Sequence, residues 1–280
     1  MKIGIIGLGL IGGSMAKTIK VRTSHTVLGR DKSPQVVQRA RLIGAIDGEL
    51  TDETLPACDM VLLALYPEAI VETLEALAPR FGKQTVVVDC GGIKTEICRR
   101  GRALSKRYGW SFIGGHPMAG IEKSGFAAAR QTLFAKASMI LAPDPRHVDL
   151  EMLARVKAFF LDLGFGSIKI TTPEEHDRVI AYTSQLAHVL SSAYIKSDTA
   201  MSHSGISAGS FRDMTRVATL QPEMWAELCI ENRQPMLNEL NGLIDRLTEY
   251  RDAIQQNDFD KLRLLLYEGS QQKALVDKLK

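Results

Sequence analysis

The sequence predicts the α/β fold class, with an N-terminal doubly wound, mostly parallel sheet followed by an all-α domain. Three observations lead to this prediction. A glycine-rich loop follows the first apolar run, short apolar runs alternate with helical patterns as far as about residue 170, and almost no strand pattern occurs beyond that point. We therefore expect two domains, residues 1–171 and 172–280.

The beginning of the chain has the pattern of a dinucleotide-binding loop. Residues 2–6 form a short apolar run with β-branched side chains, which is typical of a buried parallel strand. Residues 7–12 read GLGLIG, a G-x-G-x-x-G loop. In such a loop Gly7 allows a tight turn, Gly9 lets the backbone approach a pyrophosphate, and Gly12 lets the next helix pack closely. This order of features predicts a Rossmann domain that binds NAD or NADP.

A helix and a second strand complete the expected cofactor site. Residues 14–21 suit a helix, whose N-terminus offers free N–H groups and a positive dipole end to the phosphates. A second strand, residues 26–28, leads to Asp31, which is placed to accept hydrogen bonds from the ribose and to repel the 2′-phosphate of NADP. NAD is therefore the expected cofactor, although Arg30 and Lys32 offset part of that repulsion. The residues expected to bind it here are Gly7, Gly9, Leu10, Ile11, Gly12, Arg30 and Asp31.

Strands and helices then alternate as far as about residue 170. Further strands are expected at residues 60–64, 85–88, 111–113, 138–141 and 167–170, and helices at residues 34–42, 68–78, 95–105 and 150–163. Between Gly114 and Lys136 we expect a loop with several glycines, and loops of this kind often carry function.

The chain after residue 171 is expected to be helical. Pro173-Glu174-Glu175 has the proline and the acidic residues that are typical of a first helical turn. Further helices are expected at residues 224–232, 235–256 and 258–279, with a serine- and glycine-rich loop at residues 202–213. A helical unit with so few aromatic side chains has a limited core, so we expect it to pack against a second copy of the chain in a homodimer.

The composition argues against several classes of protein. A net charge of +3, with 45% hydrophobic and 24% charged residues, gives no indication of binding to nucleic acid or to a membrane surface. The four cysteines lack C-x-x-C spacing, so we expect reduced thiols and no metal site. No apolar stretch reaches the ~18 to 20 residues that cross a bilayer, and the N-terminus lacks a secretory signal pattern, so we expect a cytoplasmic protein.

His116 is the best candidate for acid–base chemistry. It lies in the stretch GGHPMAG, residues 114–120, directly after a predicted strand, which is where doubly wound folds bind ligands. An imidazole with an ordinary pKa near ~6.5 can take a hydroxyl proton while hydride leaves the same carbon. The alternative is that His116 only caps a turn in the loop.

Four blocks of the sequence together resemble prephenate dehydrogenase, the NAD(P)-dependent family of tyrosine biosynthesis. The blocks are GLGLIGGS at residues 7–14, GHPMAG at 115–120 with EKSG at 122–125, SQLAH at 184–188, and DMTRV at 213–217 with Trp225. They occur in the order found in the family and span most of the chain. The resemblance implies a Rossmann domain followed by a helical dimerisation domain, which agrees with the pattern of elements.

The reaction implied by this resemblance is the oxidative decarboxylation of prephenate to 4-hydroxyphenylpyruvate. Hydride passes from the ring carbon that bears the hydroxyl group to the nicotinamide, CO2 leaves, and the ring becomes aromatic. The protein therefore has mainly to position the reactants and to manage one proton. By the same resemblance, His116 is the catalytic group that is hydrogen-bonded to that hydroxyl.

The resemblance also indicates residues that bind the substrate. Ser184 and His188 are four residues apart and share a helix face, with Gln185 beside them. Arg216 has the planar guanidinium that can bind a substrate carboxylate through two hydrogen bonds. Its alternative role is a salt bridge to a neighbouring acidic side chain. Glu122 resembles a family residue at the entrance of the pocket.

Gly92 is a departure from the family pattern. In the stretch DCGGIK, residues 89–94, some relatives carry a serine two positions before the lysine, and that serine contacts the reacting hydroxyl. Here the position is Gly92, which we expect to lie at the cofactor site, with water or a backbone N–H in place of the serine. We expect Trp225 to be a core or interface anchor. The remaining histidines, expected to be structural or at the surface, are His25, His147, His176 and His203.

Other functions remain open from the sequence. Arogenate dehydrogenase acts on the amino analogue of prephenate, and only a few pocket contacts separate the two activities. A reductase of the related hydroxyacid or pyrroline-carboxylate type shares the glycine loop but lacks the later blocks. A non-catalytic NAD(H)-binding redox sensor would leave His116, His188 and Arg216 without a purpose.

Overall fold

The computed structural model describes residues 1–121, 123–146, 149–203 and 205–278. The chain divides into two compact units, Met1–Asn232 and Arg233–Lys280. The predicted domain boundary near residue 171 stays a prediction.

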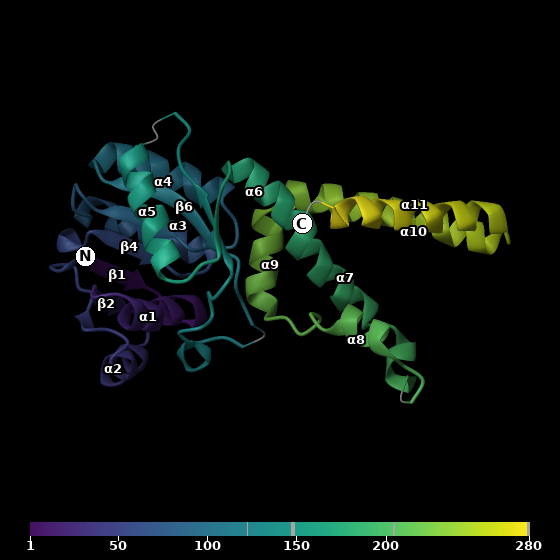
Figure 1. Ribbon diagram of the computed structural model, residues 1–280, viewed down its shortest axis with the longest axis horizontal. Coiled ribbons are helices and arrows are strands. Elements are labelled where there is room, and N and C mark those ends of the chain that lie inside the picture. Colours follow the sequence, from purple (N-terminus) through teal and green to yellow (C-terminus); the bar gives the residue numbers. More distant parts are fainter. Residues whose placement is uncertain (122, 147–148, 204, 279–280) are drawn as a thin grey trace. The chain divides into compact units, whose positions relative to one another are not determined.

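A mostly parallel sheet forms the centre of the first unit (Figure 1). Its eight strands are β1 (Lys2–Ile6), β2 (Thr26–Arg30), β3 (Gly48–Glu49), β4 (Met60–Leu63), β5 (Val86–Asp89), β6 (Ser111–Pro117), β7 (Ser138–Ala142) and β8 (Ser167–Ile170). They lie in the order β3-β2-β1-β4-β5-β6-β7-β8, and only the pairing of β6 with β7 is antiparallel among the described strands. The order reverses between β1 and β4, and folds of this kind bind ligands at such a point. The predicted fold class is confirmed.

Helices cover both faces of this sheet. One face carries α1 (Leu10–Arg22), α2 (Pro34–Leu42) and α5 (Leu150–Asp162), and the other carries α3 (Pro67–Leu77) and α4 (Thr95–Tyr108). Successive side chains of a strand point to opposite faces, so each strand supplies both layers. In β4, Met60 and Leu62 belong to the core under α1, whereas Val61 and Leu63 belong to the core under α3.

The rest of the first unit is helical. Its elements are α6 (Pro173–Ile180), a π-helical segment (Ala181–Leu186), α7 (Ala187–Tyr194), α8 (Gly209–Thr215) and α9 (Pro222–Glu231). As predicted, α6 begins at Pro173, and the Thr172 hydroxyl accepts a hydrogen bond from the Glu175 N–H at 3.2 Å. The Ser191 hydroxyl donates to the Met214 carbonyl at 2.7 Å and so joins α7 to α8.

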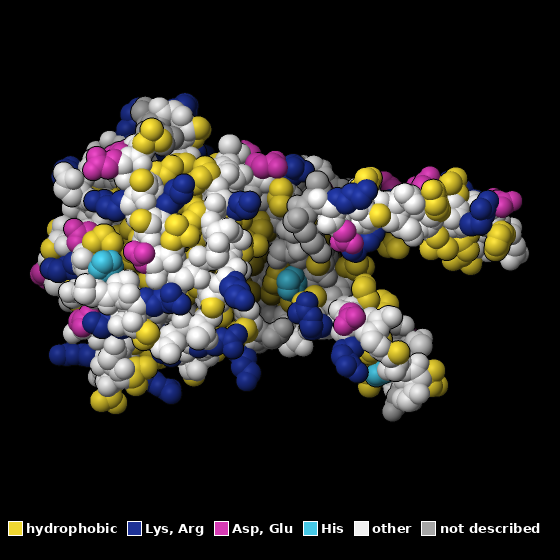
Figure 2. Space-filling model, in the orientation of Figure 1, with side chains coloured by type: hydrophobic (Ala, Val, Ile, Leu, Met, Phe, Trp, Pro, Cys, Tyr) yellow, Lys and Arg dark blue, Asp and Glu magenta, His cyan; other side chains and the backbone are white. Residues whose placement is uncertain are grey.

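The second unit, where described, is a helical hairpin of α10 (Arg233–Gln255) and α11 (Phe259–Asp277). The Tyr250 hydroxyl donates to the Leu265 carbonyl at 3.0 Å across the pair. The buried apolar residues described in this unit are Met236, Ala253 and Leu265, and larger apolar side chains along both helices are exposed (Figure 2). No helix in the described part of the chain has both the length and the apolar character that a membrane crossing requires.

Two local predictions are wrong. The strand expected to end at residue 113 continues as β6 to Pro117, and His116 is paired with Ile140 of β7 rather than placed in a loop. The glycines before His116 signal close packing instead of a turn, because a Cβ at Gly115 would lie only 2.5 Å from the Asp89 carbonyl oxygen. The second difference is α8, which begins at Gly209 inside the stretch expected as a loop.

Candidate functional site

The GLGLIG loop joins β1 to α1 at the C-terminal edge of the parallel strands. Gly7 has a φ of +88°, a conformation that L side chains rarely adopt. A Cβ at Gly12 would overlap the Gly7 carbonyl oxygen, so α1 packs closely on the loop. At Gly9, in contrast, no atom of the described residues beyond its neighbours in the chain lies within 4 Å of where a Cβ would be. The loop therefore has open space at the glycine expected to face a pyrophosphate.

The first turn of α1 also suits an anion. Gly9 is the N-cap residue, no side chain among the described residues caps the helix, and its first turn contains no acidic residue. Leu10 and Ile11 form the start of this turn, and the N–H groups there lack partners within the helix. These free donors and the positive end of the helix dipole attract phosphate. The residues present thus fit a dinucleotide.

Asp31 lies beside this loop, directly after β2. Its carboxylate accepts hydrogen bonds from the N–H groups of Leu8 at 2.8 Å and Ser33 at 3.0 Å, which hold it next to the glycines. The neighbouring Arg30 forms an ion pair with Asp52 at 2.9 Å. The contacts of Asp31 and Arg30 with the cofactor stay predictions.

His116 lies near the end of β6, at the same edge of the sheet, because the strands from β1 to β6 run parallel. The side chain is half-buried. Burial, followed by the proximity of His176 and Lys94, holds the pKa of His116 well below its usual value of 6.5. The imidazole is therefore neutral at physiological pH, and neutral imidazole is the form that accepts a proton.

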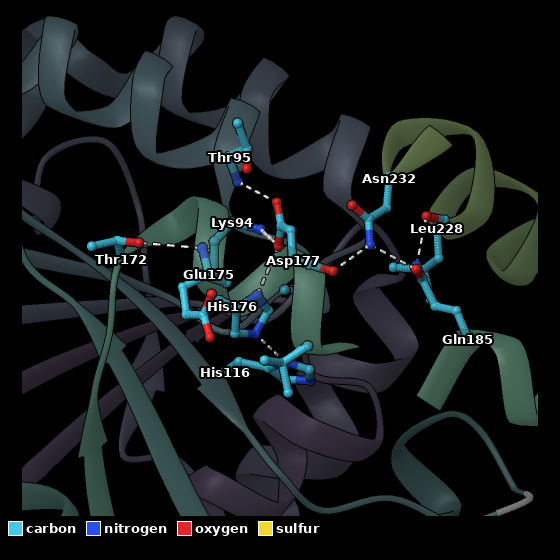
Figure 3. A network of polar contacts seen from close by, with 12 residues as sticks. Lys94, Thr95, His116, Thr172, Glu175, His176, Asp177, Gln185, Leu228 and Asn232 are labelled. Atoms are coloured by element: carbon cyan, nitrogen blue, oxygen red, sulfur yellow. Dashed lines mark hydrogen bonds and ion pairs between the residues drawn. The ribbon is translucent and has the colours of Figure 1, made fainter. Parts of the chain in front are cut away.

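A second histidine contacts His116 (Figure 3). The Nδ1 atom of His116 and the Nε2 atom of His176 are 2.9 Å apart, and His176 Nδ1 lies 2.7 Å from Asp177 Oδ1. His176 is 2% exposed and Asp177 is 4% exposed. The expectation that His176 is merely structural or at the surface misses this contact. The only sign of this contact in the sequence is the pair His176-Asp177 near the start of a helix. Acidic residues are common there because they interact favourably with the helix dipole.

Asp177 connects this pair to the start of α4. Its carboxylate accepts hydrogen bonds from the backbone N–H groups of Lys94 and Thr95, each at 2.7 Å. Burial alone would raise the pKa of Asp177, but hydrogen bonds from His176 and Thr95 outweigh it, and the pKa is lowered from 3.8. The carboxylate is therefore ionised at neutral pH and caps the helix from another element.

A buried ion pair lies next to these residues. The Lys94 ammonium bonds to the Asp89 carboxylate, and both side chains are 0% exposed. The other oxygen of Asp89 accepts a hydrogen bond from the Gly115 N–H at 3.0 Å. The pair thus joins the end of β5 to α4 and fixes the backbone immediately before His116.

Gln185 belongs to the same network. The Asn232 amide donates to the Asp177 carbonyl at 2.8 Å and to Gln185 Oε1 at 2.7 Å. In turn, Gln185 Nε2 donates to the Leu228 carbonyl at 2.8 Å. Both polar atoms of this buried side chain thus have partners within the protein, and its predicted contact with the substrate stays a prediction.

His188 and Ser184 lie where the π-helical segment meets α7. His188 Nδ1 hydrogen-bonds to the Ser184 carbonyl at 2.8 Å, which leaves Nε2 for another partner. The His188 ring packs on Trp225, with 4.0 Å between the ring centroids. Arg216 is exposed and follows α8, the helix that Ser191 joins to α7. The substrate-binding roles of Ser184, His188 and Arg216 stay predictions.

Gly92 lies in the loop between β5 and α4. A Cβ at Gly92 would lie 2.9 Å from Cδ2 of Leu228, so this leucine occupies the space that a serine side chain would need. The predicted contact of Gly92 with the cofactor stays a prediction. Glu122 and His147 lie outside the described residues.

Two family models match consecutive parts of the chain. The model described as prephenate dehydrogenase, nucleotide-binding domain, matches residues 15–169. The model described as prephenate dehydrogenase, dimerization domain, matches residues 172–268.

Individual proteins are similar over almost the whole chain. Cyclohexadienyl dehydrogenase of Zymomonas mobilis is 34% identical over 271 residues, covering 93% of this chain and 90% of that protein. The structure of arogenate dehydrogenase from Synechocystis is 28% identical with a TM-score of 0.83, covering 99% and 100% of the two chains. The structure of prephenate dehydrogenase from A. aeolicus, in complex with hydroxyphenyl propionate and NAD+, is 27% identical with a TM-score of 0.84, covering 99% and 98%.

Proposed function

The chain belongs to the prephenate dehydrogenase family of NAD-dependent oxidoreductases, and on this basis we propose that it converts prephenate to 4-hydroxyphenylpyruvate by oxidative decarboxylation in tyrosine biosynthesis. The observation that carries the proposal is the position of the half-buried His116 imidazole at the same sheet edge as the open glycine loop. A base beside a dinucleotide site is what the oxidation of a hydroxyl-bearing carbon requires.

The cofactor would be held by the first βα unit. When bound there, NAD would supply the acceptor for the hydride of the ring carbon that carries the hydroxyl group. The backbone at Gly9 and the N-terminus of α1 would bind the pyrophosphate. Asp31 would accept hydrogen bonds from the ribose, and its negative charge favours a free 2′-hydroxyl over a 2′-phosphate. These features support NAD as the preferred cofactor over NADP.

His116 would supply the proton chemistry. As hydride leaves the ring carbon, the O–H bond of the substrate breaks, an N–H bond forms at Nε2 of His116, and the carbon becomes a ketone. The ketone oxygen then takes up the electrons released when the bond between the ring and the carboxylate breaks, so CO2 leaves and the ring becomes an aromatic phenolate. The proton on His116 Nε2 returns to this oxygen and gives the phenol of the product. His188 and Arg216 would hold the substrate through its polar and carboxylate groups, with Ser184 beside them.

Arogenate is the alternative substrate, because one of the similar structures is an arogenate dehydrogenase. The decisive experiment follows NADH or NADPH at 340 nm with prephenate and with arogenate, each in the presence of NAD and of NADP. We expect the highest kcat/KM with prephenate and NAD. A higher value with arogenate would transfer the proposal to that substrate, and no turnover of either would overturn it. His116→Asn is the control variant, because it removes the base and leaves the glycine loop intact.

A further inference from the structure

The hydrogen-bonded chain from Asp177 through His176 to His116 determines which nitrogen of His116 carries a proton. The chain starts at an ionised carboxylate, which can only accept hydrogen bonds. Because Asp177 Oδ1 is 2.7 Å from His176 Nδ1, a neutral His176 ring carries its proton on Nδ1. Its Nε2 atom then has the lone pair and accepts from His116 Nδ1 at 2.9 Å. His116 is thereby left with a free lone pair on Nε2.

The charges around the two rings disfavour an added proton on His116. Lys94, paired with Asp89, is the cation beside the network, and the N-terminus of α4 adds the positive end of its dipole. Asp177 is the anion facing His176, and it already accepts two backbone hydrogen bonds from α4. A cation on the His116 ring would lie close to Lys94 in a buried region, which is unfavourable.

The hydrogen-bond partners of Asp177, His176 and His116 hold these three side chains in one geometry. Asp177 is fixed at both ends, since its carboxylate caps α4 and its carbonyl oxygen accepts from Asn232 at 2.8 Å. His176 is almost completely buried between Asp177 and His116. In Figure 3 the three side chains lie in sequence, with His176 between the other two.

We propose that His176, oriented by Asp177, is a positioning residue that keeps His116 in the tautomer whose Nε2 takes the substrate proton. The proposal deepens the proposed function and rests on it. In the proton step the substrate O–H bond breaks and the His116 Nε2–H bond forms. His116 Nδ1–H stays hydrogen-bonded to His176, and the carboxylate at the end of the chain stabilises the resulting imidazolium.

The first test is the tautomer itself, measured without turnover. Long-range ¹H–¹⁵N NMR spectra of the full-length protein with labelled histidine distinguish a protonated ring nitrogen from one with a lone pair, and His116→Asn assigns the signals. At neutral pH we expect protonated Nδ1 and unprotonated Nε2 in His116. A proton on Nε2 overturns the proposal. The proposed function fails separately, in the assay with prephenate and arogenate, so the two failures are distinguishable.

The second test is His176→Phe, which keeps a ring and removes both nitrogens. We expect protonation of His116 Nε2 to appear and kcat to fall by about tenfold to a hundredfold, with KM and the Kd for NAD changed less than about twofold. His203→Phe is the matched control, since His203 bonds to the Ala200 carbonyl on a different element. An unchanged tautomer in His176→Phe overturns the proposal, whether or not kcat falls. If this variant does not fold, the NMR measurement of the His116 tautomer in the wild-type protein is the test of the proposal.

Discussion

At the scale of single residues, the protonation of His116 controls the proposed reaction. Only the neutral imidazole accepts a proton, and the pKa of His116 is held well below 6.5 by burial and then by His176 and Lys94. Activity is therefore present above this lowered pKa and is lost as the pH falls through it. We expect kcat to stay level from about pH 8 down to about pH 6.5, where an ordinary histidine would already be half protonated. A measured kcat profile with its half-maximum at or above pH 6.5 would contradict this.

Arg216 is expected to act on substrate binding. A charge-assisted hydrogen bond to a carboxylate contributes about 1.5–3 kcal/mol, so Arg216→Ala should raise the KM for prephenate by roughly tenfold to a hundredfold. The Kd for NAD, measured by fluorescence titration, should barely change, because the predicted cofactor loop connects β1 and α1 and does not include Arg216. An unaltered KM would instead assign Arg216 to a structural salt bridge.

Gly92 and Leu228 form a pair whose sizes are matched. A Cβ at Gly92 meets the end of the flexible Leu228 side chain at 2.9 Å, so Gly92→Ser alone forces Leu228 to move. We expect Gly92→Ser with Leu228→Ala to raise kcat/KM for prephenate by up to roughly tenfold over Leu228→Ala alone, because a restored neutral hydrogen bond contributes about 0.5–1.5 kcal/mol. Gly92→Ser alone should gain less. If the double variant is no better than Leu228→Ala, the site does not lack this hydroxyl.

At the scale of elements, the local sequence predicts most of the sheet and the helices but not every contact between them. The apolar run before GLGLIG and the helix start at Pro173 are visible because burial and capping leave short-range patterns. The extension of β6 through His116 is not visible, since it depends on pairing with β7 and on glycines that could equally mark a loop. The contact of His176 with His116 joins residues 60 positions apart, and no local pattern encodes such a distance.

The Lys94–Asp89 pair is expected to stabilise the connection between β5, β6 and α4. Lys94→Met leaves a buried carboxylate without its partner, which typically costs about 3–5 kcal/mol. The free energy of unfolding, from urea titration at a fixed protein concentration, should fall by that amount. Lys261→Met is the matched control, because its pair with Glu249 is about half exposed and such pairs contribute about 0–1 kcal/mol. A loss below about 1 kcal/mol for Lys94→Met would show that water or rearrangement replaces the pair.

At the scale of the whole molecule, the apolar surface of α10 predicts association. Leu237, Ile244, Leu247 and Ile254 are between 41% and 61% exposed and recur at spacings of three and seven residues, which places them on one helix face. The second unit is too small to be stable with the few apolar residues that it buries. Together with the match to a dimerization domain, this predicts a homodimer joined through residues after about 171.

The measurement for this prediction is sedimentation or light scattering at micromolar concentration. We expect a dimer for the wild type and a shift toward monomer for Ile244→Asp. Asn238→Asp is the matched control, because it adds the same charge beside the apolar face and keeps the oxygen that accepts from Gln234. A stable wild-type monomer would rule out this assembly.

The cap that Asp177 provides for α4 has a consequence for recombinant proteins that combine domains from two homologues. The proposed base and the two side chains that orient it lie on either side of the predicted boundary near residue 171. A recombinant can take its nucleotide-binding part from one relative and its helical part from another. The equivalent of His116 then comes from the first relative, and the equivalents of His176 and Asp177 come from the second. The pair is lost if the second relative does not carry His-Asp at this position. We expect recombination to succeed more often when the crossover falls after Asp177 than when it falls at the boundary itself.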